Sequence, residues 1–284
     1  MSFKLAIRAV CAVFSAVAVV SAQAAPLMPD FALVTSAPVA LNSPTGWFTD
    51  RYEPNSFSNV GTFQGRNNVL GIGIDNAQNS AARTGTGQGG SFYNTQGRQH
   101  LISGGVGSSI SADLFIDSAW RDPTIGNVRS DMWGVMSDAG SAVTAYPIIG
   151  FTNYGSAGAR LRVFDADLAG SSGGWFDIAG PVAFNSWTSF EILFTGTSFE
   201  FSINNNLVYT DLTVGATTGF KATIMQAYNF GDTNAASPVP GAIEAGYTAH
   251  WSNVSANSVP EPGSLALMGV ALMGLVASRR RRAV

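Results

Sequence analysis

The sequence is poor in the residues on which many enzyme sites depend. Its 284 residues include one cysteine, Cys11, and two histidines, His100 and His250, and nothing in the sequence places the two histidines together. The nucleophile pattern Gly-x-Ser-x-Gly is also absent. A zinc site or a serine triad therefore has little support. Because Cys11 lies in a segment that we expect to be removed, thiol nucleophiles and disulfides are excluded from the mature protein.

Positive charge is scarce between residues 26 and 258. This segment has nine basic residues, of which only Lys221 is a lysine, against seventeen acidic ones, which gives a net charge of −8. A segment without clustered positive charge cannot neutralise a row of phosphates, so we expect no nucleic-acid partner. The same segment holds 29 aromatic residues. Their apolar surface is sufficient to exclude general disorder.

The first 25 residues have the three-part layout of a cleaved signal peptide. Lys4 and Arg8 come first, followed by an apolar run over residues 9–20 and by small residues at 21–25. The apolar run is shorter than the ~20 residues of a spanning helix, so an uncleaved anchor is the less favoured alternative. We therefore expect export, with cleavage by signal peptidase after Ala24 or Ala25.

The C-terminal segment, residues 259–284, has a second three-part layout. It contains Pro260-Glu261-Pro262, an apolar stretch over residues 264–278, and the cluster Arg279, Arg280, Arg281 and Arg282. About 15 apolar residues in a helix span only ~22 Å, which is short of the ~30 Å hydrocarbon core of a bilayer. Such a helix predicts a weak, temporary anchor with its arginines on the cytoplasmic side. An ordinary tail anchor is the alternative.

This layout resembles the PEP-CTERM sorting domain of Gram-negative bacteria that make exopolysaccharide. The resemblance implies recognition by an exosortase, with processing near Pro260, Glu261 and Pro262. It also implies transient anchoring in the inner membrane by the short helix and the arginines. The final location would then be the cell surface, the outer membrane or the extracellular matrix.

Residues 26–258 predict an all-β domain, because short apolar or alternating runs are separated by Gly, Asn, Ser and Pro. The clearest part is 187–214, where Phe190, Ile192 and Phe194 alternate with more polar residues and two further strands follow to form a meander. The other expected strands are 69–74, 111–117, 143–152, 160–165, 222–228 and 246–254. We expect residues 78–110, which are rich in glycine and small polar residues, to form a long surface loop.

Roughly ten strands in one domain predict a two-sheet sandwich of the jelly-roll kind, with a single barrel or an irregular solenoid as alternatives. The segment from Trp187 to the asparagines at 204–206 resembles concanavalin A-like and laminin G-like domains. That resemblance covers about 28 residues, which are structural, and it therefore implies a fold without implying a ligand.

The acidic residues do not form a known hydrolase motif. Asp165-Ala-Asp167 is not followed by an acid at the spacing that β-glucan hydrolases of the concanavalin-like fold use, and Glu191, Glu200 and Glu244 are isolated. Arg129-Ser-Asp131 and Gly219-Phe-Lys221 resemble two strands of alginate lyases, but the Gln-x-His element between them is absent. A polysaccharide-degrading enzyme is thus the alternative to a non-catalytic function.

Aromatic residues in predicted loops are the candidates for glycan binding, because aromatic rings stack on the apolar faces of pyranose sugars. These candidates are Trp120, Trp133, Tyr154, Trp175 and Phe176. The glycine-rich stretch 169–174 is flanked by Asp165, Asp167 and Asp177, which could hold calcium, although solvated turn acids are favoured.

We expect no other cofactor. The favoured interpretation is a non-catalytic surface or matrix protein with a sugar-binding or structural sandwich, for which exopolysaccharide is the candidate partner. The alternatives are an enzyme or a self-associating structural protein.

Overall fold

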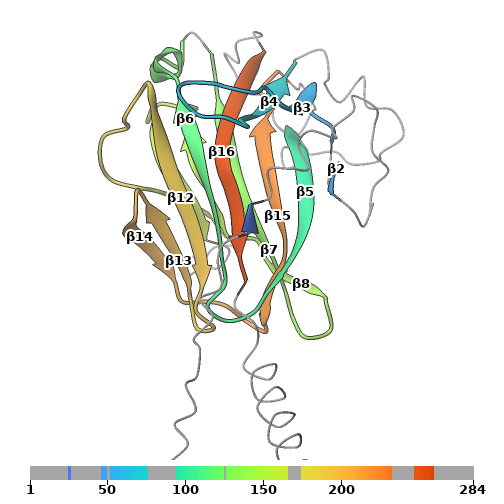
Figure 1. Cartoon of the computed structure of the whole chain (residues 1–284). Helices are drawn as coiled ribbons and strands as arrows, with labels where there is room; N and C mark the ends of the chain where they lie inside the picture. Colours follow the sequence, from blue (N-terminus) through green and yellow to red (C-terminus); the bar gives the residue numbers. More distant parts are fainter. Residues whose placement is uncertain are drawn as a thin grey trace, which may run out of the picture.

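The computed structural model describes residues 25–26, 46–49, 52–75, 94–124, 126–165, 174–231 and 246–258. These residues form two antiparallel sheets that pack face to face (Figure 1). The expectation of an all-β, two-sheet sandwich is confirmed. The expected signal peptide and C-terminal helix lie outside the described residues, apart from Ala25.

Sheet A has seven strands along its path, and an eighth, β1, pairs with β16. Its strands, in spatial order, are β14 (Asn206–Asp211), β13 (Phe199–Ile203), β12 (Ser186–Phe194), β6 (Ser109–Ile116), β16 (Tyr247–Asn257), β4 (Leu70–Ile74) and β3 (Ser56–Asn59), with β1 (Ala25–Pro26) beside β16. The final strand of the described chain therefore lies inside the sheet, between β6 and β4.

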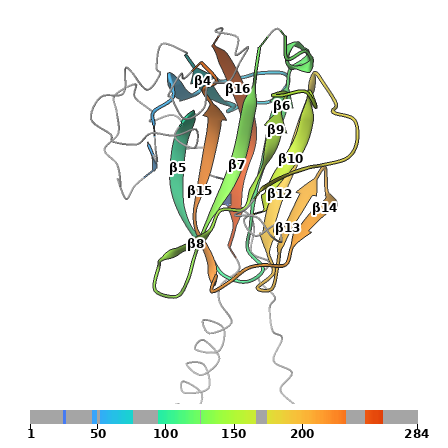
Figure 2. The same ribbon diagram turned by 180° about the vertical axis from the view of Figure 1, so that it is seen from behind.

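Sheet B forms the other layer, and Figure 2 shows the molecule turned by 180° from the view of Figure 1. Its strands, in spatial order, are β11 (Gly174–Asp177), β10 (Arg160–Asp165), β9 (Ile148–Thr152), β7 (Arg129–Ser137), β15 (Gly219–Tyr228), β5 (Thr95–Gly104) and β2 (Trp47–Thr49), with β8 (Val143–Ala145) paired to β7. A short 3-10 helix, η3 (Ser118–Arg121), follows β6.

The core lies between the sheets and is built from alternate residues of their strands, because successive side chains of a strand point to opposite faces. Phe190, Phe201 and Trp251 contribute from sheet A, and Met132 and Ile149 from sheet B, each at most 1% exposed. Burial of this apolar surface is the main term that favours the folded state.

The predicted meander is confirmed. Strands β12, β13 and β14 pair in sequence. The turn between β13 and β14 uses Asn204 and Asn205 with φ of 50° and 63°, values that asparagine adopts more readily than most residues.

Three sequence-based expectations were wrong. Part of the expected loop 78–110 forms β5, which pairs with both β15 and β2. The expected strand 143–152 is divided into β8 and β9, and Pro147, which lacks a donor N–H, stands between them. The expected loop around Trp175 is the edge strand β11, paired with β10.

Candidate functional site

The outward face of sheet B carries a second apolar cluster, separate from the core. The cluster contains Trp133, Val135, Ile148, Ala222 and Ile224, with Tyr146, Phe164 and Trp175 packed against it. The strand register explains this arrangement, because directly opposed residues of antiparallel strands share a face. Trp175 is opposite Phe164, Phe164 is opposite Ile148, Ile148 is opposite Trp133, and Trp133 is opposite Ile224.

A row of polar residues crosses the same face beside the apolar row. In it Asp177 is opposite Arg162, Arg162 is opposite Gly150, Gly150 is opposite Asp131, and Asp131 is opposite Gln226. Gly150 leaves room for the carboxylate of Asp131, since a Cβ at position 150 would overlap Asp131 and the backbone oxygen of Ser130. Charged groups from three strands, β11, β10 and β7, therefore meet on this face of the sheet.

A cavity of about 240 Å³ opens on the same face of sheet B, along the apolar row. Its lining is mostly aromatic and comes from β5, β7, β9, β10, β11, β15 and the segment before β9: Thr95, Arg129, Trp133, Tyr146, Ile148, Phe164, Trp175 and Tyr228. Ligand sites commonly combine apolar walls with a small number of directed polar groups. We call this cavity, together with Asp131, Arg162 and Gln226, the sheet B site.

Two guanidinium groups share the ring of Trp175. The Cζ atom of Arg162 lies 3.7 Å from the ring centroid, and that of Arg129 lies 4.5 Å from it. Arg129 also lies 5.1 Å from the centroid of Tyr228, while its Nε donates to Asp131 Oδ2 at 2.6 Å. The aromatic wall of the cavity is thus held against two cations by cation–π contacts.

Several polar atoms of the sheet B site are buried without a hydrogen-bond partner. Asp131 and Gln226 are fully buried, and Gln226 Nε2 donates to Asp131 Oδ2 at 2.6 Å. The other oxygens of these side chains, Asp131 Oδ1 and Gln226 Oε1, have no partner, and neither has Nε of Arg162. Buried polar groups in folded proteins are usually paired, so unpaired ones at a cavity point to a missing ligand or water.

Arg162 is a buried cation whose charge is incompletely balanced. It is 6% exposed. Burial, followed by repulsion from Arg129, lowers the pKa of Arg162 to about 9, although Asp131 and Asp177 act in the opposite direction. The two ion pairs of this face join Arg129 to Asp131 and Arg160 to Asp177, and Arg162 takes part in neither. The site therefore favours the approach of an anion.

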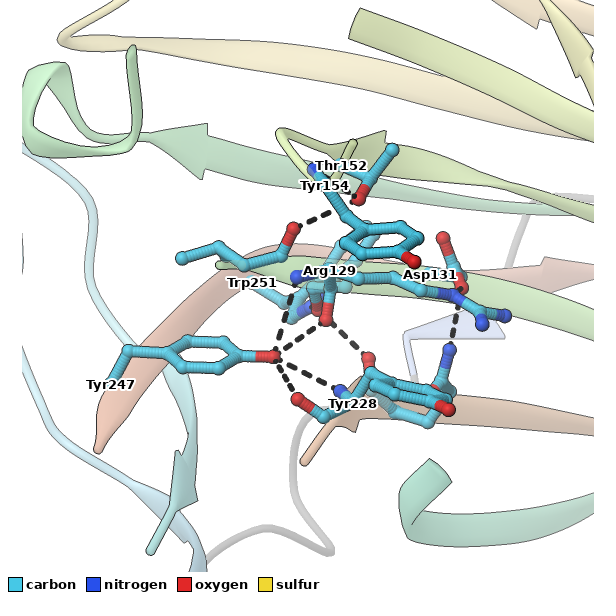
Figure 3. Close-up of polar contacts among 10 residues, drawn as sticks. Arg129, Asp131, Thr152, Tyr154, Tyr228, Tyr247 and Trp251 are labelled. Carbon is cyan, nitrogen blue, oxygen red and sulfur yellow. Dashed lines mark hydrogen bonds and ion pairs between the residues drawn. The ribbon is translucent and has the colours of Figure 1, made fainter. Parts of the chain in front are cut away.

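Tyr247 of sheet A holds the backbone of the sheet B site in place (Figure 3). Its hydroxyl accepts hydrogen bonds from the N–H groups of Tyr228 (3.0 Å) and Arg129 (3.4 Å), and it lies 2.8 Å from the carbonyl oxygen of each, to which it can donate. These bonds replace the next rung of the β7–β15 ladder, which ends at Ser130 and Ala227. Burial raises the pKa of Tyr247, so its hydroxyl keeps its proton.

A second polar contact joins the two sheets nearby. Trp251 Nε1 donates to Ser130 Oγ at 2.9 Å, and Ser130 Oγ donates to the carbonyl oxygen of Gln226 at 2.8 Å. Together with Tyr247, these bonds fix the positions from which Arg129, Asp131 and Gln226 project outward. The preorganisation of the sheet B site therefore depends on residues of β16.

The candidate aromatic residues have different locations. Trp175 and Trp133 line the cavity, although Trp133 is buried on strand β7. Phe176 is 42% exposed but points to the opposite face of β11, where it packs 4.7 Å from Tyr209. Tyr154 is 38% exposed and packs 5.3 Å from Phe230. Trp120 belongs to the core in η3, so the interpretation of Trp120 and Trp133 as loop residues was wrong.

Of the three aspartates that could hold calcium, the two described ones, Asp165 and Asp177, do not come together. Asp165 faces sheet A and accepts a hydrogen bond from the hydroxyl of Tyr209, whereas Asp177 lies on the outward face and pairs with Arg160. Asp167 lies outside the described residues. No group of three or more His, Cys, Asp or Glu side chains that could bind a metal occurs in the described part of the chain.

The outward face of sheet A has a polar hollow of about 360 Å³, lined chiefly by Ser and Asn side chains with Asp113 and Glu191. Here Asp113 already accepts hydrogen bonds from Arg66, Ser189 and Asn253. Asp113 is thus satisfied by protein donors, and no side chain of this lining has a buried polar atom without a partner.

The two histidines serve packing. His250 projects to the side of β16 opposite Ala249 and Trp251, and its ring stacks on Phe63 with centroids 3.8 Å apart. Burial lowers the pKa of His250. His100 makes an edge contact with Trp47 in sheet B. The histidines lie in different sheets and do not form a joint site.

Sequence reasoning did not identify Arg162, Gln226, Tyr146 and Tyr228 as site residues. The sequence singled out Arg129 and Asp131 only because Arg129-Ser-Asp131 resembles one strand of alginate lyases. A usable signal was present, because Arg129, Arg160 and Arg162 are three of the eight arginines between residues 26 and 258 and fall within 34 residues. Arginine at alternate positions of neighbouring strands predicts a charged face.

Comparison with known proteins identifies the C-terminal signal. Residues 258–282 match the family described as the PEP-CTERM protein-sorting motif, which confirms the resemblance based on Pro260, Glu261, Pro262 and the terminal arginines. The motif implies export, transient association with a membrane and sorting by an exosortase. In the described residues, no helix has the length and apolar character needed to cross a membrane.

The sandwich is similar to domains that act on carbohydrates. One is the carbohydrate-binding module CBM66 from Bacillus subtilis, with 15% identity and a TM-score of 0.38 over 76% of this chain and 98% of that chain. Another is a Bacillus licheniformis β-glucanase, with 13% identity and a TM-score of 0.43 over 78% and 96%. These likenesses concern the fold alone.

A sialidase aligns with 12% identity and a TM-score of 0.41 over 75% of this chain and 17% of the sialidase, so the chain spans about a sixth of that protein. No curated protein matches the chain in sequence.

Proposed function

We propose that an exosortase sorts this protein to the cell surface or exopolysaccharide matrix of a Gram-negative bacterium, where its sandwich binds polysaccharide. In this proposal, signal peptidase removes residues 1–25, residues 26–258 form the mature domain, and residues 259–284 are the sorting signal. The sorting motif at residues 258–282 supports the first part.

The sheet B site is the observation that carries the second part of the proposal. Its aromatic walls suit the apolar faces of a pyranose ring. Thr95 and Arg129 add polar groups to the lining, and such groups can bond sugar hydroxyls. A cavity of about 240 Å³ lies below the ~300–1,000 Å³ typical of sites for drug-sized ligands, which suits a single sugar unit of a longer chain.

Binding without cleavage is favoured by the way the acids of this face are held. Hydrolysis by paired carboxylates requires one acid to donate a proton and another to act as nucleophile or base. Here Asp131 is fully buried and contacts Arg129 and Gln226, while Asp177 is paired with Arg160. Each of these two carboxylates thus contacts an arginine, and the two acids are not paired with each other.

The test is retention of the full chain on a panel of immobilised polysaccharides, with the supernatant assayed for products. Trp175→Ala should weaken retention about tenfold or more, because a tryptophan that lines a pocket commonly supplies a large share of the binding energy. Phe176→Ala is the matched control, since its ring lies on the other face of the same strand. It should bind as the unsubstituted protein does.

Three results would contradict the proposal. Release of reducing ends or unsaturated sugars would identify an enzyme instead. Equal losses of retention in the two variants would show that the sheet B site is not where the polysaccharide binds. A loss of ~3–5 kcal/mol of stability in Trp175→Ala would show that the ring is a core residue and that the binding defect is indirect.

A further inference from the structure

The balance of charge at the sheet B site indicates what kind of sugar it takes. Arg129, Arg160 and Arg162 face two acids, Asp131 and Asp177, across the polar row. Two of the arginines are ion-paired with these acids, and Arg162 is left with no ion pair among the described residues. A local excess of positive charge thus stands on a domain whose overall charge is negative.

Burial makes this excess costly to the unliganded protein. Arg162 is 6% exposed and its Nε has no hydrogen-bond partner. A buried cation is stable only when a counter-charge and hydrogen-bond acceptors surround it. The lowering of the pKa of Arg162 to about 9 has burial as its largest cause and Arg129 as the next, which indicates that Asp131 and Asp177 do not supply enough counter-charge.

The geometry of Arg162 suits a planar anion. Its guanidinium lies 3.7 Å from the centroid of Trp175, so the ring occupies one face of the group. Stacking of this kind occupies the face of the guanidinium and not its N–H edge, and a guanidinium edge matches the two oxygens of a carboxylate. Arg129 lies near the same ring and adds a second positive charge.

We propose that the sheet B site binds an acidic sugar, a uronic acid unit of a polysaccharide, through its carboxylate at Arg162. This inference rests on the proposed function and specifies its ligand. The carboxylate supplies the counter-charge that Arg162 lacks, while the aromatic walls contact the sugar ring.

The test compares matched polymers on the full chain. Alginate and polygalacturonate are each titrated beside a carboxyl-reduced form, in which every carboxylate has become a hydroxymethyl group. The unsubstituted protein should bind at least one acidic polymer, and it should bind the reduced counterpart about tenfold or more weakly, as loss of a charge-assisted hydrogen-bond pair predicts. Dextran sulfate serves as a polyanion without carboxylates and should bind more weakly than the acidic polymer.

Variants assign the effect to Arg162. Arg162→Gln should weaken binding of the acidic polymer about tenfold or more and leave the reduced polymer unaffected. Arg162→Lys keeps the charge but loses the planar fork, so it should give an intermediate loss. Arg160→Gln is the matched control, because Arg160 lies two residues away on the same face and already pairs with Asp177. Its affinity should be unchanged.

The outcomes separate the inference from the proposed function. Equal affinity for the acidic and reduced polymers, unchanged binding by Arg162→Gln, or equal affinity for dextran sulfate overturns carboxylate recognition but leaves polysaccharide binding intact. Failure to bind any member of these pairs or of a neutral polysaccharide panel overturns the proposed function itself. If Arg162→Gln does not fold, the comparison of the matched polymers on the unsubstituted protein still decides the inference.

Discussion

Removing one oxygen atom at Tyr247 should destabilise the whole sandwich. In Tyr247→Phe, the N–H groups of Arg129 and Tyr228 lose their acceptor and their carbonyl groups lose the donor that served them. A hydrogen bond contributes a net ~1 kcal/mol, and each buried backbone group left without a partner costs ~1–3 kcal/mol. Because one hydroxyl donates to one carbonyl at a time, we expect a total loss of about 2 to 4 kcal/mol.

Urea unfolding of the full chain, followed by tryptophan fluorescence, measures this loss as a shift of the midpoint at constant slope. Tyr209→Phe is the matched control, since its hydroxyl makes one bond, to Asp165, at a partly exposed position where water can replace it. It should cost about 1 kcal/mol. Equal losses in the two variants would refute the reasoning, because they would show that β7 and β15 close the missing rung or admit water.

Two further predictions concern other parts of the chain. Burial lowers the pKa of His250, so the unfolded chain takes up a proton more readily than the folded chain does below about pH 6.5; stability should fall as the pH decreases through this range. His250→Gln should reduce this dependence in unfolding measured across that range, and parallel pH curves for the two proteins would contradict it. Glu261→Ala should trap a full-length, membrane-associated species, visible on immunoblots of cell fractions, because it alters the sequence at which we expect processing. Unchanged size and export would remove Glu261 from the processing site.

The strands with one solvated face show their period most plainly in the sequence. In β12 and β13, buried Phe190, Ile192 and Phe201 alternate with half-buried polar residues, so the period of two is visible in the sequence. Strand β7 is buried on both faces, with Met132 on one side and Trp133 on the other. Its pattern does not alternate and it was missed, whereas the similarly buried β4 and β15 were expected from their short apolar runs.

The site could be predicted only in part for a related reason. Trp175 was a candidate because glycines precede it, although it was assigned to a loop. Its partners Arg129, Arg162 and Gln226 come from three different strands and are brought to one face by the register of β7, β10 and β15 with their neighbours. A shift of one residue in any of these registers would send the side chain to the core. Register is not readable from a single sequence that lacks clear alternation.

Because β16 is the last strand of the described chain and lies inside sheet A, the fold can be completed only when the end of the domain is present. This strand is central in sheet A, supplies the core residue Trp251 and the hydroxyl of Tyr247, and pairs with β1 at the other end of the described chain. It ends at Asn257, and the sorting motif begins at the next residue. In a chain that crosses the membrane from its N-terminus, β16 would therefore be the last strand to cross, and β6 and β4 would lack the strand between them until then. The contacts that Tyr247 and Trp251 make to the sheet B site would then form only after nearly the whole domain has crossed.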